Sequence, residues 1–183
     1  MLFRSALLTR RIQSVAIGPL YDPVAVGICQ DGGVGARLRL RVGGKLGPES
    51  GDPVDVDCTV LGLSNRVVQT LNGGPSSLGQ CAGIRIHVEG DTRGEGIDVT
   101  LTSHRVQAGS PELFSGVGIE PENRRIIVVK STQHFHAGFA PISARVIYTG
   151  DRGALAADMR TIPYRRVATT EYWPFNPSPD FGD

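Results

Sequence analysis

Aromatic side chains and an excess of charge of either sign are both scarce in this sequence. Phe, Trp and Tyr together make up 6% of the residues, which argues against a surface that stacks on nucleic-acid bases. The formal net charge is +1, so no overall field attracts nucleic acid or anionic lipid. We therefore expect a protein with neither nucleic acid nor a membrane as its partner.

Cysteine is also rare. The three cysteines, Cys29, Cys58 and Cys81, lie far apart and form no C-x-x-C pair. Their number and spacing support neither a zinc knuckle nor a disulfide framework. We interpret all three as buried, reduced thiols.

Long apolar runs are missing as well. No stretch of about 18 apolar residues occurs, so the sequence predicts no membrane span. The apolar part of the opening MLFRSALLTRR is too short and too interrupted for a signal peptide. These absences lead us to expect a soluble, cytoplasmic protein.

Glycine and proline, by contrast, are abundant, with 24 and 12 residues, which is typical of many short elements joined by turns. Apolar residues at near-helical spacing predict a short helix over 5–13. Asp22 followed by Pro23 predicts the start of a second helix, which should end at the glycines of 31–33. Short helical turns are also expected at 110–114 and near 154–159.

Alternation of apolar and polar residues predicts half-buried strands. These strands cover 37–42, 54–60, 84–88 and 97–102, and a further strand is expected at 144–149. The run Ile126–Val129 predicts a central strand that is buried on both faces. We expect a single α+β domain over 1–183, with a mixed or largely antiparallel sheet and a few short helices. Its first ~20 residues should be a helical lead-in and its last ~12 a tail.

Two of these strands carry opposite charges on their polar faces. Arginines occupy every second position of 37–42, and aspartates occupy two such positions of 54–60. An antiparallel pair would place one stripe against the other, which fixes the register of the strands. Cross-strand ion pairing is the favoured interpretation of the arginines, and an anion site is the alternative.

The segment Ile126–Phe139 is the candidate functional site. Lys130 follows the strand, Ser131 occupies a position typical of a helix N-cap, and Phe135 and Phe139 share one helical face. His134 should lie in the first turn of that helix. A strand that leads into a helix whose first turn carries Lys, Ser and His can bind an anionic or carbonyl group.

His134 and His136 form an H-x-H pair that could suggest a metal site. On a strand both rings would lie on one face, whereas on a helix they point about 200° apart and cannot bind one ion. The helix fits the phenylalanines better, and no third ligand follows at a recognisable spacing. We therefore expect His134 to line a polar pocket and the chain to bind no metal by itself. His87 and His104 fit exposed faces of strands.

Two other motifs are better explained by structure than by catalysis. Ser131 lacks the G-x-S-x-G context of a nucleophilic serine. The glycines of 31–35 follow a helix and precede a strand, which is the reverse of the order in phosphate-binding loops. Helix capping accounts for both motifs.

Three stretches together resemble one family. They are DPVAVGICQDGGVGARLRLRVGGK over 22–45, GIEPENRRIIVVKSTQHFHAGF over 118–139 and TIPYRRV over 161–167. In this order they are similar to the C-terminal domain of the microcystinase C (MlrC)-like zinc metallopeptidases. The strongest segment is KSTQHFHAGF, and His136 stands where the family pattern typically has arginine.

The resemblance implies zinc-dependent hydrolysis of amide or peptide bonds, with the metal ligands on a separate N-terminal domain. It implies a catalytic role for His134 and substrate binding by Lys130, Ser131 and His136. Zinc would be the cofactor of the full-length family, with none expected on this chain alone. The implied partners are the N-terminal metal-binding domain, in cis or in trans, and a small peptide or amide substrate.

Three hypotheses remain open. The chain is a substrate-binding accessory domain of a metallohydrolase, a stand-alone domain that binds a small ligand, or an inactive remnant without catalysis. The sequence upstream of Met1 in the same reading frame would separate the first hypothesis from the third.

Overall fold

The computed structural model describes residues 14–91, 96–149 and 158–176. These residues fall into two units, one within 1–147 and the other within 148–183. The expected helix over 5–13 lies outside the described residues. In the second unit, Met159–Thr161 forms a 3-10 turn (η4), and the rings of Tyr164 and Phe175 meet edge to face with centroids 5.4 Å apart.

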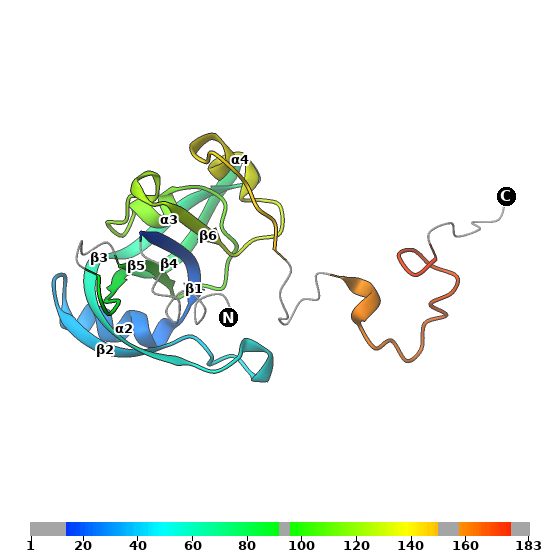
Figure 1. The fold of residues 1–183 in the computed structure, drawn as a ribbon, viewed down its shortest axis with the longest axis horizontal. Helices are drawn as coiled ribbons and strands as arrows, with labels where there is room; N and C mark the ends of the chain where they lie inside the picture. The colour runs from blue at the N-terminus through cyan, green and yellow to red at the C-terminus, as the bar shows by residue number, and fades with distance from the viewer. Residues whose placement is uncertain (1–13, 92–95, 150–157, 177–183) are drawn as a thin grey trace. The chain divides into compact units, whose positions relative to one another are not determined.

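The first unit is built on one mixed sheet, in which six strands follow the order β2-β3-β4-β5-β1-β6 (Figure 1). Neighbours from β2 to β5 are antiparallel, whereas β1 is parallel to both β5 and β6. The expectation of an α+β fold with a mixed sheet is confirmed. The strands are β1 (Val15–Tyr21), β2 (Arg37–Val42), β3 (Val54–Leu71), β4 (Gly74–Ile86), β5 (Ile97–Thr102) and β6 (Ile126–Val129).

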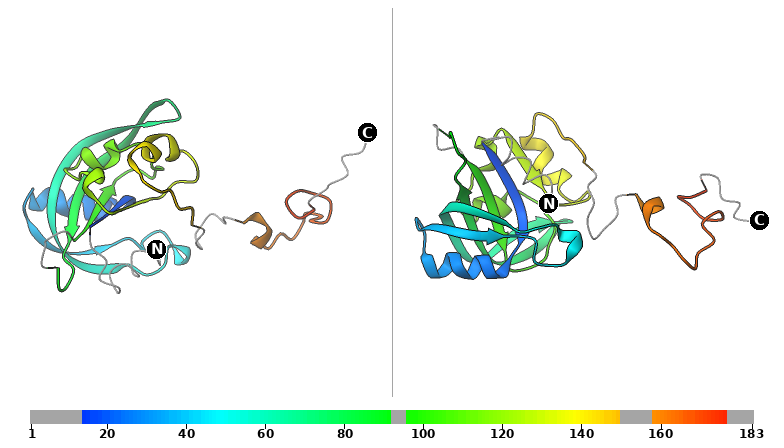
Figure 2. Two further views of the ribbon diagram at one scale, coloured as in Figure 1. Left: turned by 45° about the horizontal axis from the view of Figure 1, so that its top comes forward. Right: turned by 60° about the horizontal axis from the view of Figure 1, so that its bottom comes forward.

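Short helices cover the two faces of this sheet (Figure 2). One hydrophobic cluster joins α2 to the strands on one face, and a second cluster joins α3 and α4 to the strands on the other face. None of the described helices is long and apolar enough to cross a membrane. The helices and 3-10 turns are α2 (Pro23–Gly32), η1 (Pro48–Ser50), α3 (Glu112–Ser115), η2 (Pro121–Asn123), α4 (His136–Phe139) and η3 (Ala140–Ile142).

Helix α2 forms where the sequence predicts it. Asp22 is its N-cap and accepts a hydrogen bond from the backbone N–H of Ala25, while Pro23 occupies the first turn. The helix ends at Gly32, and Gly33 follows with φ of 79°, a left-handed conformation that glycine adopts without steric cost.

The charged stripes of β2 and β3 face each other as predicted. In the antiparallel register, Arg41 lies opposite Asp55 and Arg39 lies opposite Asp57. Arg41 and Asp55 form a bidentate pair, with Nε to Oδ1 and a terminal nitrogen to Oδ2 both at 2.7 Å. The shared face of the two stripes was therefore predictable, but only one of the stripe's possible ion pairs forms among the described residues.

Strands β3 and β4 are longer than the alternation predicts and form a hairpin. Asn72 and Gly73, both at positive φ, make its turn. Farther along the hairpin, Gly62 pairs with Gly83, and a Cβ on either residue would collide with the carbonyl oxygen of Val117. This glycine pair lets the segment after α3 pack directly on the backbone of the sheet.

Four expectations about the strands are wrong. Alternation along 97–102 predicts one exposed face, but every residue of β5 is buried, the polar ones included. Residues 15–21 are not part of a helical lead-in but form β1, which lies between β5 and β6. Strand β6 is at the edge of the sheet and its residues are only half-buried, although they pack against both clusters. Residues 144–149 form no strand. An apolar run shows that both faces are covered, but it does not show how many neighbours a strand has.

Candidate functional site

The candidate site begins at the carboxyl end of β6. The backbone N–H of Lys130 donates to the carbonyl of Gly18 in β1 (3.0 Å), and the carbonyl of Lys130 accepts from the N–H of Ala108 (3.2 Å). The chain after β6 is thus fixed between β1 and the loop that follows β5. In sheets with parallel strands, ligands commonly bind beyond the carboxyl ends of those strands.

Ser131 does not cap a helix, so its predicted local role is wrong. Its Oγ donates to Oε1 of Gln107 at 3.1 Å, and the backbone N–H of Thr132 lies 3.4 Å from the same oxygen. Helix α4 begins only at His136, and its N-cap residue, Phe135, makes no side-chain capping bond. The hydroxyl has a better-placed acceptor in Gln107, so residues 131–135 form bends and turns instead of a helical turn.

Gln107 is a residue of the site that the sequence did not reveal. Its carbonyl accepts a hydrogen bond of 2.6 Å from Nε2 of Gln69, which is 1% exposed. Oε1 of Gln69 in turn accepts from the backbone N–H of Gly109 at 2.8 Å. A buried amide that is satisfied at both ends makes a rigid support. This network of hydrogen bonds fixes the loop that positions Ser131 and Thr132.

The two phenylalanines anchor the segment, and the two histidines lie on its surface. Phe135 and Phe139 are 8% and 3% exposed, and Phe139 meets Phe114 edge to face with centroids 6.0 Å apart. His134 and His136 are exposed. His134 is therefore not a core residue held by buried hydrogen bonds.

Helix α4 also packs closely on the loop before α3. A Cβ on Gly138 would collide with the carbonyl oxygen of Gly109 and with Ser110. This close approach fixes the end of the segment that carries the histidines. The segment is therefore anchored by the Gln107 contacts at one end and by α4 at the other.

The structure brings the four expected site residues into one segment without joining their side chains. Lys130 is exposed and Ser131 is half-buried. Among the described residues, no hydrogen bond or ion pair engages the side chain of Lys130 or His134, and His136 makes only a ring contact with Phe135. The ammonium group of Lys130 and the imidazole rings of His134 and His136 are therefore available to bind a ligand.

Zinc does not fit the described residues. No three His, Cys, Asp or Glu side chains in 14–91, 96–149 or 158–176 converge on a point where they could hold a metal ion. His134 lies in a turn and His136 begins α4, so these two rings do not extend to a complete ligand set.

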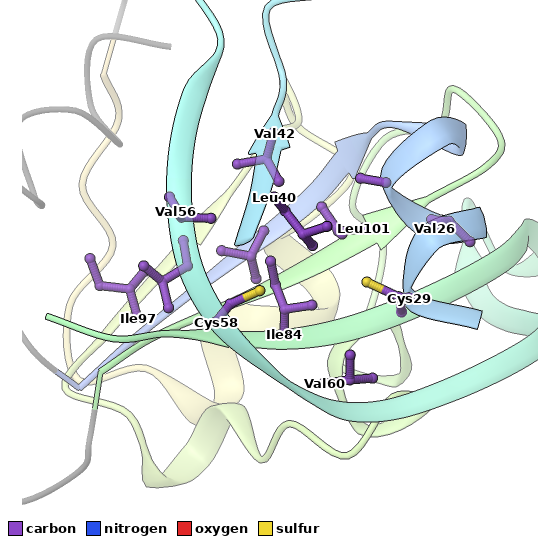
Figure 3. Packing of buried hydrophobic residues seen from close by; sticks show 14 of the residues in the cluster. Val26, Cys29, Leu40, Val42, Val56, Cys58, Val60, Ile84, Ile97 and Leu101 are labelled. Carbon is purple, nitrogen blue, oxygen red and sulfur yellow. The ribbon is translucent and has the colours of Figure 1, made fainter. Parts of the chain in front are cut away.

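The cysteines are buried in the hydrophobic clusters and are poor nucleophiles. Cys29 and Cys58 lie among aliphatic side chains between α2 and the sheet (Figure 3). Burial raises the pKa of the Cys29 thiol to about 12 and the pKa values of the Cys58 and Cys81 thiols to about 11. Nucleophilic catalysis needs a thiolate, and these thiols stay protonated near neutral pH.

A second polar cluster surrounds Asp22, whose side chain is fully buried. Its carboxylate accepts bonds from the backbone N–H of Gly43 (2.9 Å) and from Nζ of Lys45 (2.7 and 2.8 Å). Lys45 also donates to the carbonyl of Arg41. This cluster joins the start of α2 to the loop after β2. Asp22 and Lys45, at the two ends of the stretch 22–45, therefore have a structural role.

The fold and the site together define an α+β domain with a cationic segment at the carboxyl end of an edge strand. The family model described as MlrC C-terminus matches residues 2–166. The chain belongs to this family, as the resemblance in the sequence suggested.

Similar proteins agree with this assignment. The chain is 33% identical over 177 residues to microcystinase C from Sphingomonas sp., an alignment that covers 97% of this chain and 32% of that protein. A crystal structure of a candidate metallopeptidase from Mesorhizobium sp. BNC1 is similar in fold, with a TM-score of 0.73 and 22% identity over 94% of this chain and 33% of that chain. The chain spans about a third of the length of these relatives.

Proposed function

We propose that this chain is the substrate-binding, accessory part of an MlrC-type zinc metallohydrolase that cleaves amide or peptide bonds. One observation carries the proposal. The segment with the strongest family resemblance is also the segment where the side chains of Lys130, His134 and His136 lie exposed without an ion pair or hydrogen bond from the described residues. Zinc, in this proposal, binds to a part of the protein that the chain does not span.

The chemistry of the segment suits the recognition of a peptide or amide. The ammonium of Lys130 can bind a carboxylate or a carbonyl oxygen by a charge-assisted hydrogen bond. The ring of His134 can donate a hydrogen bond to the oxygen that gains negative charge during hydrolysis. Ser131, held by Gln107, keeps the start of this surface fixed. His136 adds a second imidazole donor.

A chimaera tests the proposal. This chain would replace the matching third of microcystinase C from Sphingomonas sp., and cleavage of a linear peptide would be followed with and without His134→Gln. We expect the substitution to lower kcat by roughly 10²-fold or more, the scale of losing one oxyanion donor. The melting temperature should change little, because His134 is exposed.

His104→Gln is the matched control, since His104 is exposed and lies after β5 rather than after β6. It should leave both kcat and stability close to those of the parent chimaera. Equal kinetic constants for the two variants would remove His134 from the reaction. A melting temperature that falls for His134→Gln, with kcat per folded molecule intact, would give the residue a structural role.

A further inference from the structure

Two arginines of β2 lack the ion pairs that the charged stripes predict. Arg37, Arg39 and Arg41 lie on the face of β2 opposite α2, because Leu38 and Leu40 between them pack into the α2 cluster. Arg41 pairs with Asp55. The side chains of Arg37 and Arg39 are exposed, and no hydrogen bond or ion pair joins either of them to a described residue. Arg39 acts on Asp55 only at longer range, because Arg41 and, less strongly, Arg39 lower the pKa of Asp55.

A hollow of about 390 Å³ lies beside these two guanidinium groups. This volume falls within the range of small-molecule sites, at its lower end. The hollow is formed by β2, β3 and the residue that follows β4, at the opposite edge of the sheet from β6. Its lining residues are Arg37, Leu38, Arg39, Asp57, Cys58 and His87.

His87 is held in place at this hollow. Its backbone N–H donates to the carbonyl of Asp57 at 2.9 Å, and its Nε2 lies 2.9 Å from Oγ1 of Thr59. The imidazole is thus held by Thr59, and His87 and Asp57 line the same hollow. The hollow combines the backbone of β2 and β3 with polar groups from these two strands and from His87, the residue after β4.

The charges of the hollow specify a ligand. Two guanidinium forks bind two carboxylates, and alternate residues of a strand place their Cα atoms about 6.6 Å apart, so the two forks suit separate carboxylates better than one. Asp57, directly opposite Arg39 in the register, offers one carboxylate to a cation. A small molecule with two carboxylates and one ammonium group complements this set.

We propose that the hollow formed by Arg37, Arg39, Asp57 and His87 binds a free acidic α-amino acid, with its two carboxylates on the arginines and its ammonium group on Asp57. This site is separate from the segment after β6 and does not depend on the proposed metallohydrolase function. It accounts for the two arginine side chains that form no direct hydrogen bond or ion pair across the strands.

Calorimetric titration of the purified chain with three ligands of related carbon skeleton tests the proposal. L-glutamate carries all three charges, glutarate lacks the ammonium, and 4-aminobutyrate lacks one carboxylate. We expect saturable binding of L-glutamate in the millimolar range. Each of the other two should bind about two- to fivefold more weakly, the scale of one exposed ion pair. No saturation by L-glutamate, or equal affinity for all three ligands, would overturn the proposal.

Two variants assign the contacts. Arg39→Gln should abolish saturable binding, whereas Arg66→Gln, an exposed arginine elsewhere on the sheet, should bind L-glutamate like the parent. Asp57→Asn should weaken L-glutamate binding and strengthen glutarate binding, because only L-glutamate uses the lost charge. Circular dichroism would show that each variant is folded. Equal binding by the Arg39 and Arg66 variants, or an unchanged ligand order in Asp57→Asn, would contradict the assignment.

Discussion

Replacing Asp22 by alanine should destabilise the sheet unit strongly. The carboxylate is fully buried and accepts bonds from the N–H groups of Ala25 and Gly43 and from Nζ of Lys45. Loss of an N-cap costs about 1 kcal/mol. Leaving a buried N–H without an acceptor costs about 1–3 kcal/mol more. Lys45 is partly exposed and water can hydrate its ammonium group, so it adds little and we expect a total of about 2–4 kcal/mol.

Urea denaturation followed by circular dichroism measures this effect. With a slope of about 2 kcal/mol per M, the loss corresponds to a midpoint about 1–2 M lower. Asp22→Asn keeps only one acceptor oxygen for two N–H donors, so its midpoint should lie between those of the parent and the alanine variant. This graded variant also keeps the test informative if Asp22→Ala does not fold.

Asp55→Ala is the matched control, because Asp55 also pairs with a cation of the β2 region but is solvent-exposed. Exposed pairs contribute little to stability, so its midpoint should stay close to that of the parent. The reasoning would be refuted if Asp22→Ala and Asp55→Ala shifted the midpoint equally. That result would mean that burial of the carboxylate does not determine its contribution.

Two further predictions concern the thiols and the metal. The raised pKa values of Cys29, Cys58 and Cys81 predict that a thiol reagent at pH 8 labels the folded chain roughly 10²-fold more slowly than the urea-unfolded chain. Unfolded thiols ionise at about pH 8.5, so the contribution of the buried thiols to the free energy of unfolding should be fully present below that pH. It should fall as the pH rises towards the pKa values of the folded thiols. Fast labelling of the folded chain, or a free energy of unfolding that does not change at alkaline pH, would contradict this. Metal analysis after dialysis should find less than one zinc per chain, and stoichiometric zinc that His134→Ala removes would show a site that the described residues do not reveal.

Local patterns predicted the parts of the fold that local physics determines. Asp22 and Pro23 mark the start of α2 because capping involves only neighbouring residues. Alternation along 37–42 and 97–102 predicted β2 and β5 with the bounds that the structure shows. The charge stripes predicted that the arginines of β2 and the aspartates of β3 share one face, because a shift by one residue would reverse every buried side chain. They did not predict which arginine lies opposite which aspartate, because a shift by two residues keeps the stripes together.

The elements that the sequence patterns did not predict are strand β1 and the long β3–β4 hairpin. The first depends on partners far away in the sequence, and the second depends on a turn. Strand β1 contains Gly18 and Pro19, which interrupt its pattern, and it is stabilised by strands from much later in the chain. The hairpin turn at Asn72-Gly73 carries a recognisable signal, since Asn-Gly readily adopts positive φ, and the long β3–β4 hairpin could have been found from it.

The candidate site was predictable only in part. The run of polar residues after 126–129 located the segment, and the phenylalanine spacing indicated which side chains are buried. Gln107 and Gln69 left no local signal, because their hydrogen bonds join residues 24 and 38 positions apart in sequence. The position of Ser131 predicts a helix cap, but its hydroxyl donates to Gln107, an acceptor on another loop.

The position of β1 in the sheet has a consequence for the synthesis of the protein. Strand β1 ends at Tyr21, but its neighbours β5 and β6 end at Thr102 and Val129. At a translation rate of about 5–20 residues per second, β1 leaves the ribosome roughly 5–20 s before β6 is available. The antiparallel strands β2 to β5 can pair in the order in which they emerge. The apolar residues of β1, in contrast, stay without their neighbours β5 and β6 until those strands have been synthesised. This early strand is therefore the segment that nascent-chain chaperones should protect longest.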